Sequence, residues 1–241
     1  MDNRGFGRRS KAGFAMKLSI LVYDGFTALD AVGGYEVLSR IRGIDTEFVG
    51  PRRGVIAADT RRLALLAWRD FADVRATDIL YVPGGPGAFE REHDEEFLAD
   101  LRRLDATSTW TVGICNGVGL LAAAGLLAGR AATTNWFYRE RLAACGVNVV
   151  DERFHRDGKY VTGAGVSASI DTALYLTSLI AGEKVAKLLQ LGIEYYPAPP
   201  FPERTPAEAP PEAQAAIGRY ESVALDQLHR TVAPFDVIVT R

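Results

Sequence analysis

Short apolar segments that alternate with helical segments constrain the fold of this chain most. Residues 17–23 and 79–82 are runs of strand-forming residues, and glycine follows each run before the next segment begins. Residues 111–114 form a third run, which leads directly into a helical pattern that stops at Gly129. Buried parallel strands joined by helices produce this alternation. The sequence therefore predicts an α/β fold with a doubly wound, mostly parallel sheet and helices on both faces.

One such domain, over residues 16–192, accounts for most of the 241-residue chain. Residues 1–15 are basic and glycine-rich but have no apolar core, so we expect a disordered N-terminal tail and not a secretory signal. Residues 195–211 are proline-rich and extended, and residues 212–230 have an amphipathic helical pattern. We expect residues 193–241 to form a proline-rich segment and a C-terminal helix that packs on the domain.

Composition excludes several classes of function. The net charge of -2 offers no electrostatic footprint for nucleic acid or for an anionic membrane surface. The longest apolar run, around residues 118–129, is far shorter than the ~20 residues of a membrane helix. His93, His155 and His229 are scattered, and neither of the 2 cysteines has a CxxC partner, so no metal site is expected. So few cysteines make the cytoplasm the expected location.

Polar groups follow three of the predicted strands. Asp24 and Asp30 come after the first strand, Gly84 and Gly85 after the second, and Cys115 directly after the third. In a doubly wound sheet, ligands bind at the carboxyl ends of the strands. We therefore expect these groups to meet at one edge of the sheet.

Cys115 lies at a strand-to-helix corner between Gly113 and Gly117. This is the thiol version of the sharp turn that exposes a serine nucleophile in α/β hydrolases. The positive end of the following helix would favour the thiolate. A buried cysteine acting as a small apolar group is the alternative, and the two glycines favour the nucleophile. Cys145, near a helix end with no partner, is interpreted as structural.

Three carboxylates compete for the role of the site acid. Asp24 precedes a glycine and is typical of a turn. Glu36 lies about 9 Å further along the helix than Asp30 and about 240° around it, so the two cannot both face the sulfur. Asp30 is nearest the strand end. A catalytic acid and a carboxylate that merely stabilises a helix N-terminus both remain open for it.

Backbone amides near Cys115 suggest a site for developing negative charge. The Gly84–Gly85 pair brings backbone N–H groups close to a ligand, and the N–H groups of Gly85 and Asn116 could form an oxyanion hole. A simple turn over residues 83–87 is compatible with that role, since such a hole is built from a turn.

Residues 163–168 match the GxGxxG/A pattern of dinucleotide-binding sites, follow a predicted strand and open a helix. The motif comes late in the chain, and no further strand–helix units follow to complete such a site. We interpret it as a glycine-rich wall near the nucleophile.

Four segments resemble the ThiJ/PfpI superfamily, whose fold is flavodoxin-like and similar to class I glutamine amidotransferases. They are YDGFTALDAVGGYEVLSR, ILYVPGGPG, TVGICNGVGLLAAAGLLAGRAATTNW and VTGAGVSASIDTAL. Within the superfamily the isonitrile hydratases are most similar, on the LD at Asp30, the AGLLAGRAATTNW stretch and the IEYYPAPPF segment. The resemblance covers roughly residues 16–205.

The resemblance implies specific roles for three residues. Cys115 would be the nucleophile, Asp30 the acid that contacts its sulfur, and Asn116 the residue that orients the substrate, where isonitrile hydratases typically have threonine. Asn135 stands where a histidine is common, and no histidine follows Cys115. A Cys–His base is therefore not evident, which counts against peptidase and glyoxalase-type activities.

The function implied is a hydro-lyase that adds water to an isonitrile and releases an N-substituted formamide. The Cys115 thiolate would attack the terminal carbon, and Asp30, kept protonated by burial, would donate a proton. Water would then resolve the thioimidate, with no metal or organic cofactor. Trp136 and Phe137 are expected either to line the substrate pocket or to serve ordinary helix packing.

The resemblance also implies a homodimer that acts on a small molecule, with no nucleic-acid or membrane partner. Related domains are fused to DNA-binding helices in some regulators, but residues 212–241 hold one predicted helix and no helix-turn-helix. Two alternatives remain open: a ligand- or redox-sensing domain without turnover, and a small-molecule hydrolase or deglycase of the same superfamily.

Overall fold

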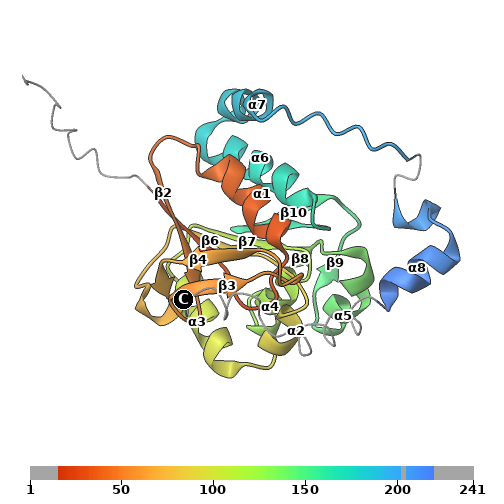
Figure 1. The fold of residues 1–241 in the computed structure, drawn as a ribbon, viewed down its shortest axis with the longest axis horizontal. Coiled ribbons are helices and arrows are strands. Elements are labelled where there is room, and N and C mark those ends of the chain that lie inside the picture. Colours follow the sequence, from red (N-terminus) through yellow and green to blue (C-terminus); the bar gives the residue numbers. More distant parts are fainter. Residues whose placement is uncertain (1–15, 202–204, 220–241) are drawn as a thin grey trace, which may run out of the picture.

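A central sheet organises the computed structural model, which describes residues 16–201 and 205–219 (Figure 1). Within these residues the sheet has seven strands in the order β10-β11-β7-β6-β1-β2-β5, and all neighbours are parallel except β10 and β11. The strands are β1 (Met16–Leu21), β2 (Ile44–Gly50), β5 (Arg69–Asp70), β6 (Ile79–Val82), β7 (Trp110–Ile114), β10 (Phe154–Asp157) and β11 (Tyr160–Gly163). This confirms the predicted mostly parallel sheet.

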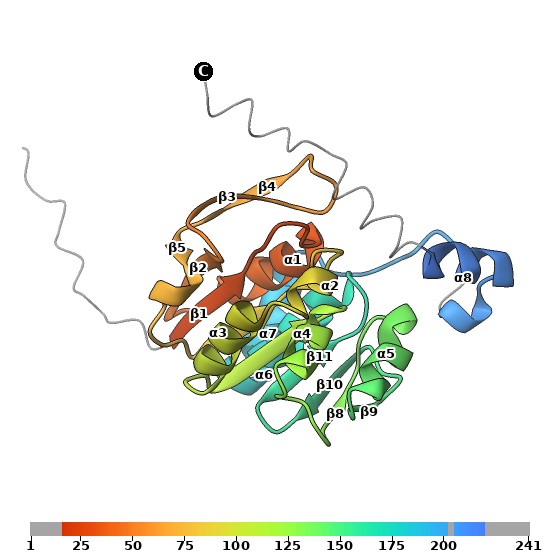
Figure 2. The same ribbon diagram turned by 90° about the horizontal axis from the view of Figure 1, so that it is seen from below.

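Helices cover both faces of the sheet, as the alternating pattern predicts (Figures 1 and 2). One face carries α1 (Ala28–Leu38), α6 (Ala168–Ala181) and α7 (Glu183–Gly192), and α6 packs against both of the others. The other face carries α2 (Ala88–Arg91), α3 (Glu95–Asp105) and α4 (Gly117–Ala123). Beside α4 lie α5 (Arg139–Ala144) and the parallel pair β8 (Ala131–Ala132) and β9 (Asn148–Val149).

A separate hairpin stands beside the start of α1 (Figure 2). It consists of β3 (Gly54–Ala57) and β4 (Ala64–Ala67), which pair antiparallel. A parallel bridge between Phe26 and Ala58 ties the hairpin to the loop after β1. This contact brings the end of β3 next to the carboxyl end of the central sheet.

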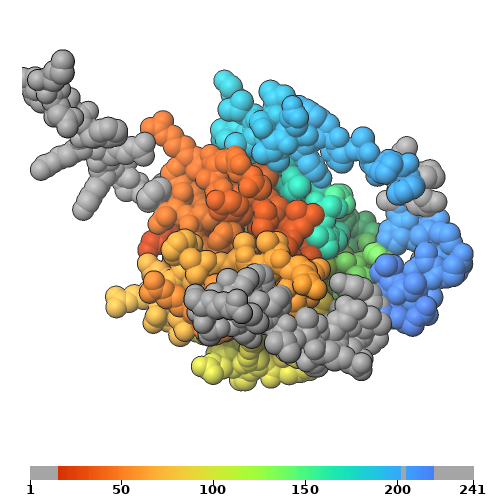
Figure 3. Space-filling view, in the orientation of Figure 1, coloured from red at the N-terminus to blue at the C-terminus, as the bar shows by residue number. Residues whose placement is uncertain are grey.

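The C-terminal part runs from α7 along the outside of the domain to α8 (Pro211–Gly218), visible in blue in Figure 3. Of the helix predicted over residues 212–230, the structure describes residues up to 219, where α8 ends at Gly218. The predicted tail over residues 1–15 lies outside the described residues. Across the described ranges, no helix is both long and apolar enough to span a membrane.

Thr27 is the N-cap residue of α1, but its side chain makes no capping hydrogen bond. The hydroxyl of Thr27 donates instead to Asp59 Oδ2, at 2.8 Å. The Thr27 hydroxyl therefore binds the hairpin and does not cap the first turn of α1.

A tight contact between α1 and β6 positions Asp30. The Tyr81 hydroxyl donates to the backbone carbonyl of Asp30, at 2.9 Å, and the tyrosine is fully buried. A Cβ at Gly34 would lie 2.3 Å from the Tyr81 ring, so only glycine allows this approach.

We expect Gly34→Ala to lower the free energy of unfolding by about 1–3 kcal/mol, because the new methyl group must displace the buried Tyr81 ring. Urea denaturation checks this. Gly192→Ala is the control, since nothing lies within 4 Å of a Cβ at Gly192. Equal stability of the two variants would contradict the tight packing of α1 on β6.

Candidate active site

Cys115 occupies a strained turn between β7 and α4. Its φ of 55° lies in the left-handed region, which costs a non-glycine residue about 1–3 kcal/mol unless the surroundings impose it. Two hydrogen bonds fix the turn: the Cys115 N–H donates to Gly163 O at 3.1 Å, and the Thr134 hydroxyl donates to Cys115 O at 2.6 Å. Cys115 therefore lies at a sharp strand-to-helix turn, as the sequence predicts.

Glycines give this corner its room. A Cβ at Gly117 would lie 2.5 Å from the carbonyl oxygens of Val82 and Pro83, so α4 can approach the end of β6 only at glycine. A Cβ at Gly113 would lie 2.9 Å from Leu121 Cδ1. Both glycines that flank Cys115 are thus required by close packing.

The Cys115 thiol is nearly enclosed, with 4% of the residue exposed. Asn135 Nδ2 donates to the sulfur at 3.3 Å. Burial raises the pKa of Cys115 well above its usual value, and the charge of Asp30 raises it further, whereas the Asn135 side chain and the Asn116 N–H lower it. The N-terminus of α4 was expected to favour the thiolate, whereas burial of Cys115 favours the neutral thiol.

Asp30 lies in the first turn of α1 and is completely buried. Its Oδ2 accepts a hydrogen bond from Gly84 N at 2.8 Å, while its Oδ1 has no partner among the described residues. Burial raises the pKa of Asp30 to about 7, against the opposing effect of the Gly84 N–H, and Asp59 raises it further. Near neutral pH this carboxyl group therefore exists in both protonation states, as a proton shuttle requires.

The other carboxylates considered for this role lie elsewhere. Asp24 faces Arg61 and Arg52, at 3.5 and 3.6 Å. Glu36 pairs with Arg40 on the exposed side of α1. Neither lines the pocket described below.

Asn116 ties the start of α4 to the turn after β6. Its Oδ1 accepts from Gly85 N at 2.7 Å, and its Nδ2 donates to Gly85 O at 3.0 Å. The Gly85 N–H that we expected to face a developing anion is therefore occupied, and the Gly84 N–H is occupied by Asp30. An oxyanion role for Gly85 would require Asn116 to rotate away; the Asn116 N–H already lies beside the sulfur.

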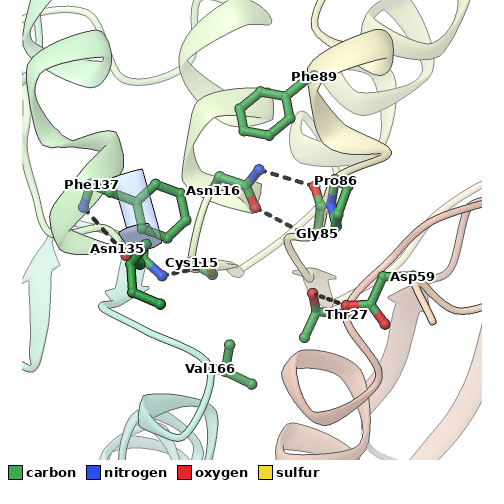
Figure 4. Close-up of a pocket in the computed structure, with 11 residues that line it drawn as sticks. Thr27, Asp59, Gly85, Pro86, Phe89, Cys115, Asn116, Asn135, Phe137 and Val166 are labelled. Atoms are coloured by element: carbon green, nitrogen blue, oxygen red, sulfur yellow. Dashed lines mark hydrogen bonds between the residues drawn. The ribbon is translucent and has the colours of Figure 1, made fainter. Parts of the chain in front are cut away.

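A pocket of about 270 Å³ opens over Cys115 (Figure 4). Its described lining residues are Thr27, Asp59, Gly85, Pro86, Phe89, Cys115, Asn116, Asn135, Phe137, Val166 and Ile217. Phe137 is among them, as expected, but Trp136 is not: it packs edge-to-face against Phe137 at a centroid distance of 5.9 Å. Asp30 lies behind this lining.

Four lining residues were not predicted as site residues: Thr27, Asp59, Phe89 and Ile217. Asp59 and Thr27 come together only because the β3–β4 hairpin folds against the β1–α1 loop. Ile217 reaches the pocket from α8, about a hundred residues beyond Cys115 in sequence.

The glycine-rich stretch at the end of β11 forms part of the site wall. A Cβ at Gly163 would lie 2.4 Å from Thr172 Oγ1, and Val166 lines the pocket. This matches the interpretation of residues 163–168 as a wall near the nucleophile. Within residues 16–201 and 205–219, no group of three or more His, Cys, Asp or Glu side chains is arranged to hold a metal ion.

We expect Asp30→Asn to speed alkylation of Cys115 by iodoacetamide at pH 8 severalfold, up to about tenfold for each pKa unit lost. The reason is that the Asp30 charge raises the pKa of the thiol. Asn135→Ala should slow the reaction, since it removes a hydrogen bond that lowers the same pKa. Peptide mass spectrometry measures both rates, with the exposed Cys145 as internal control. Slower alkylation of Asp30→Asn would contradict the electrostatic coupling.

Asp30 should also make stability depend on pH. Its pKa is about 7 in the folded protein against 3.8 ordinarily, so unfolding releases a proton between these values and stability falls as pH rises from 4 to 7. Relative to Asp30→Asn, the wild-type protein should lose up to about 4 kcal/mol over this interval. Chemical denaturation at several pH values measures the difference, and parallel curves for the two proteins would refute the shift.

Comparison with known proteins agrees with the fold. The DJ-1/PfpI family model matches residues 16–179. A relative from Pseudomonas putida named isonitrile hydratase is 34% identical over 220 residues, which cover 91% of each protein.

A solved structure of a ThiJ/PfpI family protein from Pseudomonas syringae has a TM-score of 0.82 at 28% identity, over 95% of this chain and 97% of that one. Drosophila melanogaster DJ-1beta has a TM-score of 0.68 at 20% identity, over 76% and 99%. The chain therefore belongs to the DJ-1/PfpI family.

Proposed function

We propose that this protein hydrates isonitriles to N-substituted formamides, with Cys115 as the nucleophile. The observation that carries the proposal is the buried Cys115 thiol, which lines a mostly apolar pocket and is electrostatically coupled to Asp30, a carboxyl group with a pKa of about 7. Similarity to an isonitrile hydratase along 91% of the chain supports the same reaction.

The first step would be addition of the thiol across the terminal carbon of the isonitrile. An ionised Asp30 accepts the thiol proton as the sulfur–carbon bond forms, and then delivers that proton to the same carbon. The product is a thioimidate, in which the carbon carries one hydrogen and is doubly bonded to nitrogen. A carboxyl group with a pKa near neutrality serves both directions of this transfer.

Water would complete the reaction. It adds to the thioimidate carbon while the nitrogen takes up a proton, and the carbon–sulfur bond then breaks to release the formamide. The leaving sulfur carries negative charge, which the Nδ2 group of Asn135 and the N–H of Asn116 stabilise. Asp30 takes the excess proton of the added water and returns it to the sulfur, so the enzyme ends in its starting state.

The two alternatives receive less support from the site. Peroxide sensing depends on the thiolate, and burial raises the pKa of Cys115. A hydrolase that relies on a Cys–His pair needs a histidine at the sulfur, whereas the described side chain that donates to the sulfur is Asn135.

Purified protein incubated with cyclohexyl isocyanide should release N-cyclohexylformamide, measured by chromatography and mass spectrometry. Cys115→Ala should reduce turnover by at least about a thousandfold, because it removes the covalent step. Cys145→Ala, at the exposed cysteine, is the matched control and should retain full activity. Wild-type turnover indistinguishable from that of Cys115→Ala would end the proposal.

A further inference from the structure

The pocket over Cys115 has a pronounced charge asymmetry. Asp59 is the one Asp, Glu, Lys or Arg side chain among its described lining residues, and the rest are apolar, amide, hydroxyl, thiol or glycine groups. Figure 4 shows Asp59 and Thr27 on the side of the pocket opposite Asn135 and Phe137, with Cys115 between the two sides. A ligand that reaches the sulfur therefore passes one fixed carboxylate.

Asp59 is held in place by the backbone and by Thr27. Its N–H donates to Phe26 O at 2.9 Å, its Oδ1 accepts from Thr60 N at 2.7 Å, and its Oδ2 accepts from Thr27 Oγ1 at 2.8 Å. Each carboxylate oxygen can accept a second hydrogen bond, and the residue is only partly buried. The carboxylate is thus preorganised and still able to bind a ligand group.

The neighbouring cations are engaged with a different carboxylate. Arg61, on the same hairpin loop, places its guanidinium 3.5 Å from Asp24, and Arg52 lies 3.6 Å from the same residue. Neither arginine is among the residues that line the pocket. The negative charge of Asp59 is therefore not matched by a cation on the described pocket wall.

An aromatic ring in the pocket attracts cations, as the Asp59 carboxylate does. Phe137 lines the pocket, and the face of a phenylalanine ring attracts cations. The Phe89 ring also lines the pocket, but the Arg141 guanidinium already lies over it, 5.1 Å from its centroid. The pocket thus has a carboxylate on one side and the Phe137 ring on the other, and both attract an ammonium group.

We propose that Asp59 selects substrates that carry a positively charged ammonium group at the end remote from the reacting carbon. The reaction at that carbon rests on the function proposed above, whereas the charge selection rests on the pocket alone. Anionic substrates of the same size are disfavoured by the same carboxylate.

Binding of such a cation would also prepare the nucleophile. The charge of Asp59 raises the pKa values of both Asp30 and Cys115. An ammonium group beside Asp59 offsets that charge and so makes the thiol easier to ionise when the substrate is in place.

Charged methanethiosulfonates test the selection without relying on isonitrile turnover. Each transfers its thioalkyl group to the thiolate and releases methanesulfinate. The 2-(trimethylammonio)ethyl reagent and the 2-sulfonatoethyl reagent differ in the sign of their charge. In the wild-type protein, the ratio of cationic to anionic labelling rates should be at least about fivefold higher at Cys115 than at the exposed Cys145. Equal ratios at the two cysteines, or no labelling of Cys115 by either reagent, would overturn the proposal.

The Asp59→Asn variant tests whether Asp59 causes the higher ratio of cationic to anionic labelling rates at Cys115. The amide oxygen can still accept a hydrogen bond from Thr27 or Thr60, so we expect the variant to fold and the Cys115 ratio to approach that of Cys145. Asp24→Asn removes a similar charge that does not line the pocket, and should leave the wild-type ratio in place. An unchanged ratio in Asp59→Asn, or an equal loss in Asp24→Asn, would contradict the role of Asp59.

A pair of isonitriles then links the selection to catalysis. One carries a trimethylammonium group and the other the neutral, isosteric tert-butyl group. Wild-type kcat/KM should favour the cation by at least about fivefold, and Asp59→Asn should abolish this preference. Turnover without preference would overturn the charge selection alone. Absence of turnover for both compounds, with selective labelling of Cys115 retained, would overturn only the hydration chemistry.

Discussion

The left-handed backbone at Cys115 is the constraint on which the site depends. It turns the chain from β7 into α4, and the strained conformation persists because Gly163 O and the Thr134 hydroxyl hold the Cys115 backbone from either side. These contacts come from the end of β11 and from the segment after β8, so the position of the sulfur depends on how these segments pack against the end of β7. The same turn leaves the thiol as part of the pocket wall.

Burial favours the neutral form of this thiol. Cys115 and Asp30 both lie in surroundings that penalise charge, and each favours a neutral resting form more strongly than its ordinary pKa suggests. When Asp30 is ionised, the pair carries one negative charge, and that charge passes to the sulfur as the thiol proton moves to the carboxylate. Asn135 and the Asn116 N–H lie where they stabilise negative charge on the sulfur.

Asn116 shows how a local feature acquires its role from a distant segment. Its side chain closes a two-bond contact with the Gly85 backbone, which joins the start of α4 to the turn after β6. An amide side chain donates and accepts from two separate atoms, whereas a threonine hydroxyl has one oxygen for both roles. Asn116 therefore fixes the start of α4 to the Gly85 backbone through two separate side-chain atoms.

The sequence by itself determined the parallel sheet and the meeting of Asp30, Gly84 and Cys115. Each residue follows an apolar strand, and β1, β6 and β7 are adjacent and parallel, so their carboxyl ends coincide. Tertiary structure alone decided that Asp59 and Ile217 reach the pocket, that Trp136 does not, and that burial raises the pKa of the Cys115 thiol. Strand patterns and glycines are local signals, whereas desolvation and contacts between a hairpin, a loop and a distant helix exist only once the chain has packed.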